Sequence, residues 1–467
     1  MKTILTDDAR NTLDQRQKTA LFLLLAAAGF LLFWRRPLVL WLFNLLASFF
    51  YLTSSFYKFL LVFLGLYRRS EIFVPVEAID RLGPDELPVY TILLPLYRET
   101  EVLDQLISSI SRLDYPAERL DVKLLIEAND APMQAALAAR SLPANFELVI
   151  IPDSLPKTKP KACNVGLEQA RGEFLVIYDA EDIPDSDQLK KSVWAYRNLQ
   201  DPRVICLQAK LNYYNSRQNL LTRWFTAEYS MWFDLYLPGM DFLQVPIPLG
   251  GTSNHFRTGK LKELGGWDPY NVAEDCELGI RLFRAGYRTR VLDSTTWEEA
   301  NSNLGNWLAQ RSRWVKGYLQ TFLVHHRKPV RLVRELGWFN YFSFSLSVGG
   351  LFVVLLLNPL YWVTTSLWLL RYWGRPELLF PNPYYELVTR ALLAGNFIFI
   401  LLNLLGCVRR RLYYLVPVTF IAPVYWFLMS LGAWQGFRQL IFSPHYWAKS
   451  RHGLTVPLLE AGEAGVE

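Results

Sequence analysis

A dense group of carboxylates follows a short apolar run in the middle of this sequence. Residues 174–178 are apolar or aromatic, and Asp179, Glu181 and Asp182 follow at once. This pattern is typical of a buried parallel strand whose carboxyl end opens into a crevice. Because the carboxylates repel one another, we expect a nearby cation. Mg²⁺ or Mn²⁺ would suit, since hard ions take oxygen ligands and bridge substrate phosphates. A solvated acidic loop that caps the next helix is the alternative.

Strands and helices alternate around this acidic group. The pattern predicts strands at 89–95, 122–127, 147–151 and 174–178, separated by helices at 99–113, 134–140 and 161–171. This alternation indicates right-handed βαβ units, a mainly parallel sheet and an α/β fold. Ligands of such sheets bind outside the carboxyl ends of the strands. Polar residues follow three of these ends: Tyr97 with Glu99, Asp130, and Asp179.

The overall composition favours membrane contact over nucleic-acid binding. Hydrophobic residues make up 51% of the chain and are concentrated towards its two ends, while the net charge is only +6. This small basic excess lies beside the apolar stretches, and no compact basic and aromatic motif accompanies it. The four cysteines are scattered without a CxxC pair, so they indicate neither a zinc site nor a disulfide framework and suit a reducing compartment.

Four stretches have membrane-like sequences. Residues 20–34 and about 38–66 predict a transmembrane hairpin, with Lys58 as the one formal charge in the second stretch. Residues 342–370 and 388–407 are also long and apolar enough to span, and Arg409 to Arg411 form a positive cluster suited to the cytoplasmic face. Residues 412–441 contain two prolines, so we expect a re-entrant or interfacial segment there; a full span is the alternative.

Six motifs occur in order between Tyr90 and His325: LLPLYRE (93–99), EAND (127–130), KPKACN (159–164), DAED (179–182), NVAED (271–275) and QRSRW (310–314). The set resembles the membrane-embedded, cellulose-synthase-like glycosyltransferases of family 2. The resemblance implies a GT-A type, Rossmann-like domain inserted between N- and C-terminal transmembrane helices. The expected parts are an N-terminal tail and hairpin (1–69), the cytosolic domain with interface helices (70–330), C-terminal transmembrane and interfacial helices (331–441), and a gating-like loop and tail (442–467).

The resemblance also implies roles for single residues. The donor-binding residues it implies are Tyr97, Glu99, Asp130, Lys159, Asp179 and Arg313. Asp179 and Glu181 are the expected metal ligands, with Asp182 as the alternative second ligand. The acceptor-binding residues it implies are Gln310, Trp314, Gly251, Thr252 and Ser253. Trp447, Lys449 and Arg451 would belong to a mobile loop over the nucleotide; a basic interfacial anchor is the alternative.

Asp275 is the expected catalytic residue. Inverting transfer needs one general base, which removes the acceptor hydroxyl proton as that oxygen attacks the anomeric carbon. The departing diphosphate gains negative charge, which Lys159, Arg313 and a divalent ion would stabilise. Simpler interpretations exist: Asp275 as a helix N-cap, and Arg313 or Trp314 as membrane-interface residues. We expect a structural role for His255, because Asp275 already serves as the base.

The expected function is inverting transfer from a UDP-sugar, with UDP-glucose as the expected donor, to a growing β-linked polysaccharide at the membrane. Single transfer to a membrane lipid, or a non-catalytic envelope component that retains the fold, are the alternatives. The expected partners are the UDP-sugar, a glycan or lipid acceptor, membrane lipids and envelope proteins, and no nucleic acid. The expected location is the inner (plasma) membrane, as a multi-pass protein with a cytosolic catalytic domain.

Overall fold

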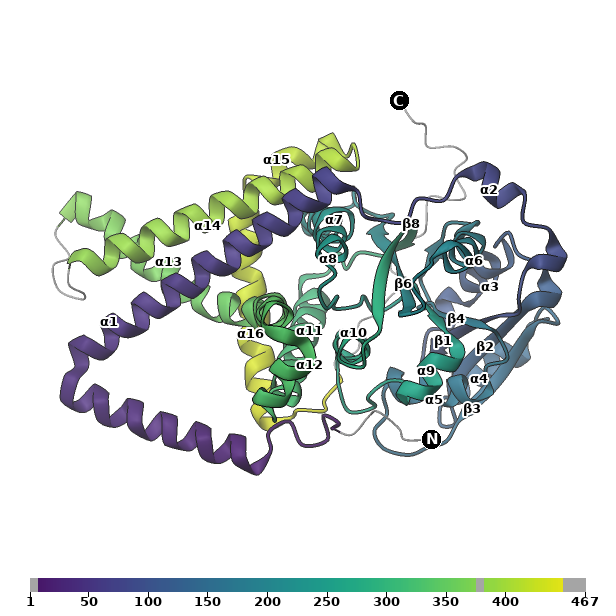
Figure 1. Cartoon of the computed structure of the whole chain (residues 1–467), viewed down its shortest axis with the longest axis horizontal. Helices are drawn as coiled ribbons and strands as arrows, with labels where there is room; N and C mark the ends of the chain where they lie inside the picture. Colours follow the sequence, from purple (N-terminus) through teal and green to yellow (C-terminus); the bar gives the residue numbers. More distant parts are fainter. Residues whose placement is uncertain (1–6, 375–381, 448–467) are drawn as a thin grey trace.

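The structure, a computed structural model, describes residues 7–374 and 382–447. It has two parts that lie side by side (Figure 1). One part is a sheet with helices on both faces, and the other is a group of long helices. The chain enters through a long helix, forms the sheet domain, and returns to the long helices at its C-terminal end.

The sheet has eight strands in the order β3-β2-β1-β4-β7-β6-β8-β5. The strands β1 to β4 are mutually parallel, as are β6 and β8, whereas β7 runs antiparallel to β4 and β6, and β5 runs antiparallel to β8. The mainly parallel α/β sheet is therefore confirmed. Their bounds are β1 Tyr90–Leu96, β2 Leu120–Glu127, β3 Phe146–Ile151, β4 Phe174–Ile177, β5 Ile183–Pro184, β6 Val204–Tyr213, β7 Asn254–Arg257 and β8 Arg288–Glu298.

Apolar side chains from the strands enter two cores, one on each face of the sheet. Alternate residues of a strand point to opposite faces, so Ile92 and Leu94 enter one core whereas Leu93 enters the other. The central strands are consequently buried on both sides, as in other parallel sheets. The helices of this part are α2 Val76–Asp80, α3 Leu103–Ser111, α4 Ala131–Ala138, α5 Lys159–Gln169, α6 Gln188–Asn198, α7 Leu220–Met231, α8 Leu237–Leu243, α9 Thr258–Leu264, α10 Glu274–Arg284 and α11 Leu304–His325.

The first two apolar stretches, predicted as a transmembrane hairpin, form the two arms of one bent helix, α1 (Gln15–Arg68). The bend lies at Arg35, where the backbone leaves helical geometry, two residues before Pro37. Proline removes a helical hydrogen bond and crowds the preceding turn, which accounts for the bend. The two arms diverge from it (Figure 1), and no residue of 15–46 is buried. The apolar side chains of the first arm, which precedes the bend, are therefore largely exposed.

Three further helix groups complete the second part: α12 Pro329–Phe344 with α13 Gly350–Gly374, α14 Asn382–Arg409, and α15 Val416–Thr419 with α16 Ala422–Phe442. Among the described residues, three segments are long and apolar enough to cross a membrane: α1, Pro329–Val363 and Arg390–Arg409. The pair Tyr413–Thr419 and Ala422–Phe442 would be a fourth, but it is bent by 69°. This bend falls where the two prolines predict a broken segment.

Candidate active site

Two adjoining cavities open at the carboxyl ends of the strands. The outer cavity has a volume of about 630 Å³, and Tyr97, Glu99 and Trp447 lie in its wall. The inner cavity, about 270 Å³, continues from the sheet domain between helices α1, α13, α14 and α16. Cavities of such size hold small molecules. Four residues line both cavities and mark where they meet: Lys159, Asp179, Glu181 and Arg313.

Asp179 is paired with a lysine at the start of a helix. Lys159 is the first residue of α5, and its Nζ donates to the Asp179 carboxylate and, at 2.8 Å, to the carbonyl oxygen of Gly251. Burial alone would lower the pKa of Lys159, but the negative charges of Asp179 and Glu274 outweigh burial and raise it. The lysine therefore stays charged beside the positive end of a helix, an environment that suits a phosphate group.

Asp182, the third acid of the DAED motif, stabilises the loop that contains this motif through hydrogen bonds. Asp182 is 1% exposed, accepts the backbone N–H of Asp179 at 2.8 Å and accepts the hydroxyl of Thr252. Burial raises its pKa well above the ordinary value, and the charges of Asp179 and Glu181 raise it further. Asp182 lines neither cavity, whereas Glu181 lines both. Of the two alternatives for a second metal ligand, Glu181 is thus the one that faces the cavities.

Asp275 lies in the first turn of α10 and lines the inner cavity. The N-cap of this helix is Ala273, so the interpretation of Asp275 as an N-cap is wrong. Its Oδ1 accepts the N–H of Cys276 at 2.7 Å, and a side-chain carbon added to Gly251 would lie 3.4 Å from its Oδ2. Burial raises the pKa of Asp275, and burial together with the Asp275 charge raises that of its neighbour Glu274 to about 7. A base with a raised pKa suits proton abstraction near neutral pH.

Helix α11 supplies the opposite wall. Gln310, Arg313 and Trp314 line the inner cavity from three positions that share a helix face. Burial lowers the pKa of Arg313, although the charges of Glu274, Asp179 and Asp275 oppose this shift. The Arg313 Nε is buried without a hydrogen-bond partner among the described residues. The guanidinium therefore lies inside the site with unused donor capacity, and not on a membrane-facing surface.

Trp314 belongs to an aromatic group in the cavity wall. Its ring centroid lies 6.3 Å from that of Tyr229, and the guanidinium of Arg311 lies over its ring at 4.7 Å. Arg311 in turn forms ion pairs with Glu228 and donates to the Tyr425 hydroxyl at 2.7 Å. The arginine between Gln310 and Arg313 in the sequence is thus a structural residue that anchors α11 to α7 and α16.

Other expected site residues lie at the edges of this arrangement. Asp130 is 1% exposed and lines neither cavity, because its carboxylate accepts the N–H of Arg98 at 2.6 Å and caps α4. Ser253 is fully buried and donates to Thr296 at 2.7 Å, away from both cavities. Thr252 and Gly251 do line the inner cavity. Lys449 and Arg451 lie outside the described residues.

His255 lies inside the sheet domain, where its contacts agree with the structural role predicted from the sequence. It is fully buried, its Nδ1 lies 2.7 Å from the Tyr90 hydroxyl, and its Nε2 lies 3.2 Å from the Gln188 side-chain oxygen. Burial lowers its pKa to about 3, so the ring is neutral at physiological pH. It lines neither cavity.

Three charged residues of the inner-cavity wall lie outside the six sequence motifs. Glu298 ends β8, and burial together with the charges of Asp182 and Glu181 raises its pKa well above the ordinary value. Its position at the end of a strand is the sequence feature that could have identified it. Glu228 lies on α7, where no motif marks it. Lys58 lies over the rings of Trp232, Tyr236 and Phe399; a charge inside an apolar stretch was its signal.

The donor groups present fit a divalent ion that also binds a diphosphate. Asp179 and Glu181 offer carboxylate oxygens where the two cavities meet. In the described ranges 7–374 and 382–447, no group of three or more His, Cys, Asp or Glu side chains could hold a metal by itself. Mg²⁺ commonly binds through one or two carboxylates while phosphates and water supply the other ligands. Asp179 and Glu181 could therefore supply only part of such a coordination shell.

Comparisons with known proteins agree with this geometry. The model of "Glycosyl transferase family group 2" matches residues 174–448. The chain is 28% identical over 306 residues to the probable glycosyltransferase YdaM of Bacillus subtilis, covering 62% of this chain and 72% of that protein. It is 24% identical over 261 residues to glucomannan 4-beta-mannosyltransferase 2 of Arabidopsis thaliana, covering 54% of this chain and 48% of the relative. The chain therefore spans about half the length of this plant relative.

A solved structure shares the fold. Mannosyltransferase PcManGT from Pyrobaculum calidifontis, in complex with GDP-Man and Mn²⁺, superimposes with a TM-score of 0.51 at 19% identity, covering 85% of this chain and 99% of that one. This likeness agrees with a GT-A type sheet domain, as expected from the motifs. The family model covers more than half of the chain. The protein belongs to the family 2 glycosyltransferases, and its relatives include cellulose-synthase-like members.

Proposed function

We propose that this glycosyltransferase is an inverting enzyme that extends a β-linked polysaccharide at the membrane from a nucleoside diphosphate sugar. One observation carries this proposal. Most of the residues expected to bind donor and acceptor, though not Asp130 or Ser253, line two adjoining cavities that share four wall residues, and the inner cavity runs between apolar helices. A site on the sheet domain alone would serve a soluble acceptor, whereas a space that continues among long apolar helices suits a chain that leaves through them.

In this proposal Asp275 is the general base. Its carboxylate takes the proton of the acceptor hydroxyl while that oxygen attacks the anomeric carbon and the bond to the diphosphate breaks. Because this is a single displacement, the configuration at the anomeric carbon inverts. Lys159 and Arg313 stabilise the charge that develops on the departing diphosphate. Asp179 and Glu181 would hold Mg²⁺ or Mn²⁺, which when bound supplies further positive charge at the diphosphate.

The acceptor lies on the Trp314 side of the site. An aromatic ring offers a flat apolar face to the C–H side of a pyranose, and Trp314 and Tyr229 both line the inner cavity. Gln310, Gly251 and Thr252 supply polar groups in the same wall. The outer cavity, with Tyr97, Glu99 and Trp447, would hold the nucleotide.

UDP-glucose is the donor we propose. GDP-mannose is the second candidate, because the solved relative binds GDP-Man and the plant relative is named for mannosyl transfer. A membrane lipid is the second candidate acceptor, because apolar residues of α13 and α14 such as Leu355 and Phe399 line part of the inner cavity. We further propose a multi-pass protein of the plasma membrane whose sheet domain faces the cytosol.

A donor screen in lipid nanodiscs tests these proposals. The purified protein is incubated with Mn²⁺ and radiolabelled UDP-glucose or GDP-mannose, and the products are sized and extracted with chloroform. A polymer that a β-glycanase degrades supports the proposal. Label in the chloroform phase without polymer would favour the lipid acceptor. Absence of transfer from both donors, with Asp275→Asn indistinguishable from the parent in cells, would favour a non-catalytic envelope role.

A further inference from the structure

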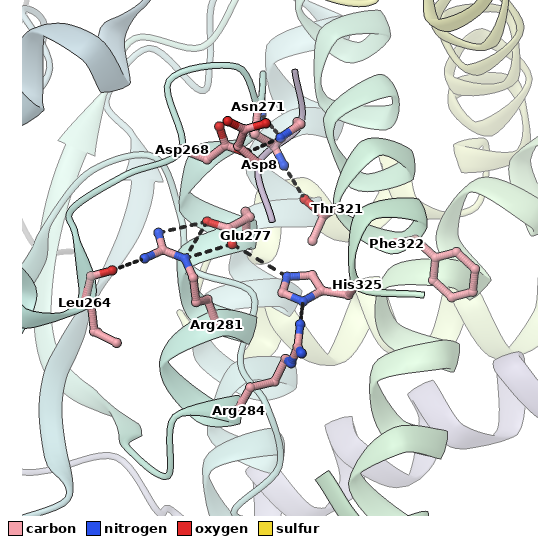
Figure 2. A network of polar contacts seen from close by, with 12 residues as sticks. Asp8, Leu264, Asp268, Asn271, Glu277, Arg281, Arg284, Thr321, Phe322 and His325 are labelled. Carbon is pink, nitrogen blue, oxygen red and sulfur yellow. Dashed lines mark hydrogen bonds and ion pairs between the residues drawn. The ribbon is translucent and has the colours of Figure 1, made fainter. Parts of the chain in front are cut away.

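The N-terminal segment, residues 7–14, lies against the sheet domain and not in solvent. Ala9 is fully buried, and its backbone N–H donates to the Asp268 carboxylate at 2.7 Å. The other oxygen of Asp268 accepts the N–H of Tyr270 at 2.9 Å. Figure 2 shows Asp8 beside Asp268 and Asn271, at the edge of the polar network around Glu277. The segment is therefore joined to the loop that leads to Asp275.

A second anchor lies at the end of α11. Arg327 donates to the carbonyl oxygen of Asp8 at 2.9 Å and to that of Asn11. The Asp7 carboxylate lies 3.9 Å from the Arg327 guanidinium. Gln17 closes the segment, because it forms the capping box of α1 with Asp14 and donates to the carbonyl oxygen of Leu323 at 2.8 Å. The segment is thus held at both ends and enters α1 from a fixed position.

Between these anchors, the segment contacts the stretch that follows α16, residues 443–447. The Nε2 of His445 lies 3.0 Å from the carbonyl oxygen of Arg10, and its Nδ1 lies 3.3 Å from that of Tyr270. The guanidinium of Arg10 lies over the Tyr270 ring at 4.7 Å, and the rings of Tyr270 and His445 are 5.7 Å apart. His445 therefore joins the N-terminal segment to the loop before Asp275.

Helix α11 holds the same stretch from the other side. Gln320 donates to the carbonyl oxygen of Pro444 at 3.0 Å and accepts the N–H of Val272 at 3.1 Å. Lys316 donates to the carbonyl oxygen of Tyr446 at 2.5 Å. These bonds set the position of Trp447, whose ring lies 4.5 Å from the Arg313 guanidinium in the wall of the outer cavity.

We propose that the N-terminal segment is a positioning element of the donor site: through Arg10 and His445 it fixes Trp447 against Arg313. The inference rests on the proposed function, since that function assigns Arg313 to the donor diphosphate. Arg10 and His445 touch no reacting atom and act only through Trp447. The position of Trp447 in the wall of the outer cavity is then linked to residues 7–14, since Arg10 and His445 are 435 positions apart in sequence.

Two variants release this contact from opposite sides. His445→Ala removes the bridge to the carbonyl oxygens of Arg10 and Tyr270. Arg327→Met releases the N-terminal segment without touching residues 443–447. Each is expected to raise the Kd for UDP or GDP and the KM for the nucleotide sugar about tenfold, the effect of losing one or two hydrogen bonds, with little change in kcat. Because both act on one path, the double variant is expected to be no weaker than the worse single variant.

The experiment uses the full chain in nanodiscs with Mn²⁺, and nucleotide binding is followed by calorimetry alongside kinetics. Asn11→Ala, an exposed side chain on the same segment, is the matched control and is expected to bind like the parent. Parent-like binding by His445→Ala, additive effects in the double variant, or an equal loss by Asn11→Ala would overturn the proposal. Failure of the parent to bind either nucleotide would instead contradict the proposed function. If His445→Ala unfolds at a lower temperature than the parent, the binding measurement is repeated with His445→Asn, which keeps one hydrogen-bond donor. The same outcomes then support or overturn the proposal.

Discussion

Asp275 has an environment that differs from that of an exposed carboxylate. It is half-buried beside the buried Glu274, and the positive charges of Lys159 and Arg313 lie nearby. Burial favours the neutral acid and the cations favour the carboxylate, and the balance raises the pKa of Asp275. The same residues that would bind the diphosphate therefore also control the charge of the proposed base.

Replacing Asp275 tests its role directly. Asp275→Asn keeps the size of the side chain but cannot take a proton, so we expect kcat to fall by about 10²–10⁴-fold while nucleotide binding stays near the parent value. Single-turnover kinetics and calorimetry on the same preparation separate the two quantities. Asp201→Asn, at a half-buried carboxylate that pairs with Arg203 and lines neither cavity, is the control. A kcat within a few-fold of the parent would remove Asp275 from the base role.

The pH dependence should report the two acids as a coupled pair. The proposed base is active when deprotonated, and both pKa values are raised, that of Glu274 to about 7. The rate should therefore fall, as the pH decreases, at a pH above that at which an exposed carboxyl titrates, which is about pH 4. Glu274→Gln removes a negative charge beside Asp275, so the acid limb of the kcat profile should move to lower pH. A limb that stays in place would show that another group controls it.

At the scale of elements, α11 and the loop before α10 form one unit. Residues 310, 313, 314, 317, 320 and 321 recur at helical spacing, so they share one face. Gln320 and Thr321 bond to the loop at Val272 and Asn271, and Gly317 lies directly against Ala273. The spacing between Asp275 and Arg313 depends on this close approach.

A larger residue at position 317 should increase the distance between Asp275 and Arg313. Any side-chain carbon there would collide with the backbone and Cβ of Ala273. We expect Gly317→Val to move α11 away from the loop and to lower kcat/KM by about 10²-fold, the cost of a displacement of about 1 Å in a catalytic site. Gly259→Ala on α9 is the control, because nothing lies within 4 Å of its added carbon. Parent-like kinetics for Gly317→Val would mean that the spacing tolerates change.

The arrangement of strands could be predicted from the sequence, whereas the orientation of several side chains could not. Alternating strands and helices correctly predicted the mainly parallel sheet, and Asp179, which the sequence placed after a strand, lines both cavities. The orientation of single side chains could not be predicted from the sequence. Ser253 has a positive φ of 57°, and its hydroxyl donates to Thr296. The Asp130 carboxylate accepts the N–H of Arg98. Such orientations depend on partners distant in the sequence, which no local pattern encodes.

At the scale of the whole molecule, buried ion pairs join the long helices to the sheet domain. Arg409 ends α14 and Arg410 follows it, within the positive cluster that the sequence predicts for the cytoplasmic face. In the structure Arg409 pairs with Glu71 at 2.8 Å and Arg410 pairs with Asp234. Lys210 of β6 lies 3.6 Å from both acids. These charges connect α14 with the residues after α1 and with the sheet, so the two parts of the molecule share one polar network.

Breaking this network should reduce stability more than removing a surface charge. Asp234 and Arg410 are 7% and 11% exposed, so Arg410→Met leaves a buried carboxylate whose remaining ion-pair partner, among the described residues, is Lys210. Removing one partner of a buried pair costs about 3 kcal/mol, and we expect a matching decrease in the midpoint of thermal unfolding in detergent. Arg411→Met, at the adjacent exposed arginine, should leave the midpoint unchanged. Asp234→Asn in the Arg410→Met background should restore part of the loss, because it removes the uncompensated charge. Equal effects at positions 410 and 411 would mean that the arginines act through membrane contact and not through the sheet domain.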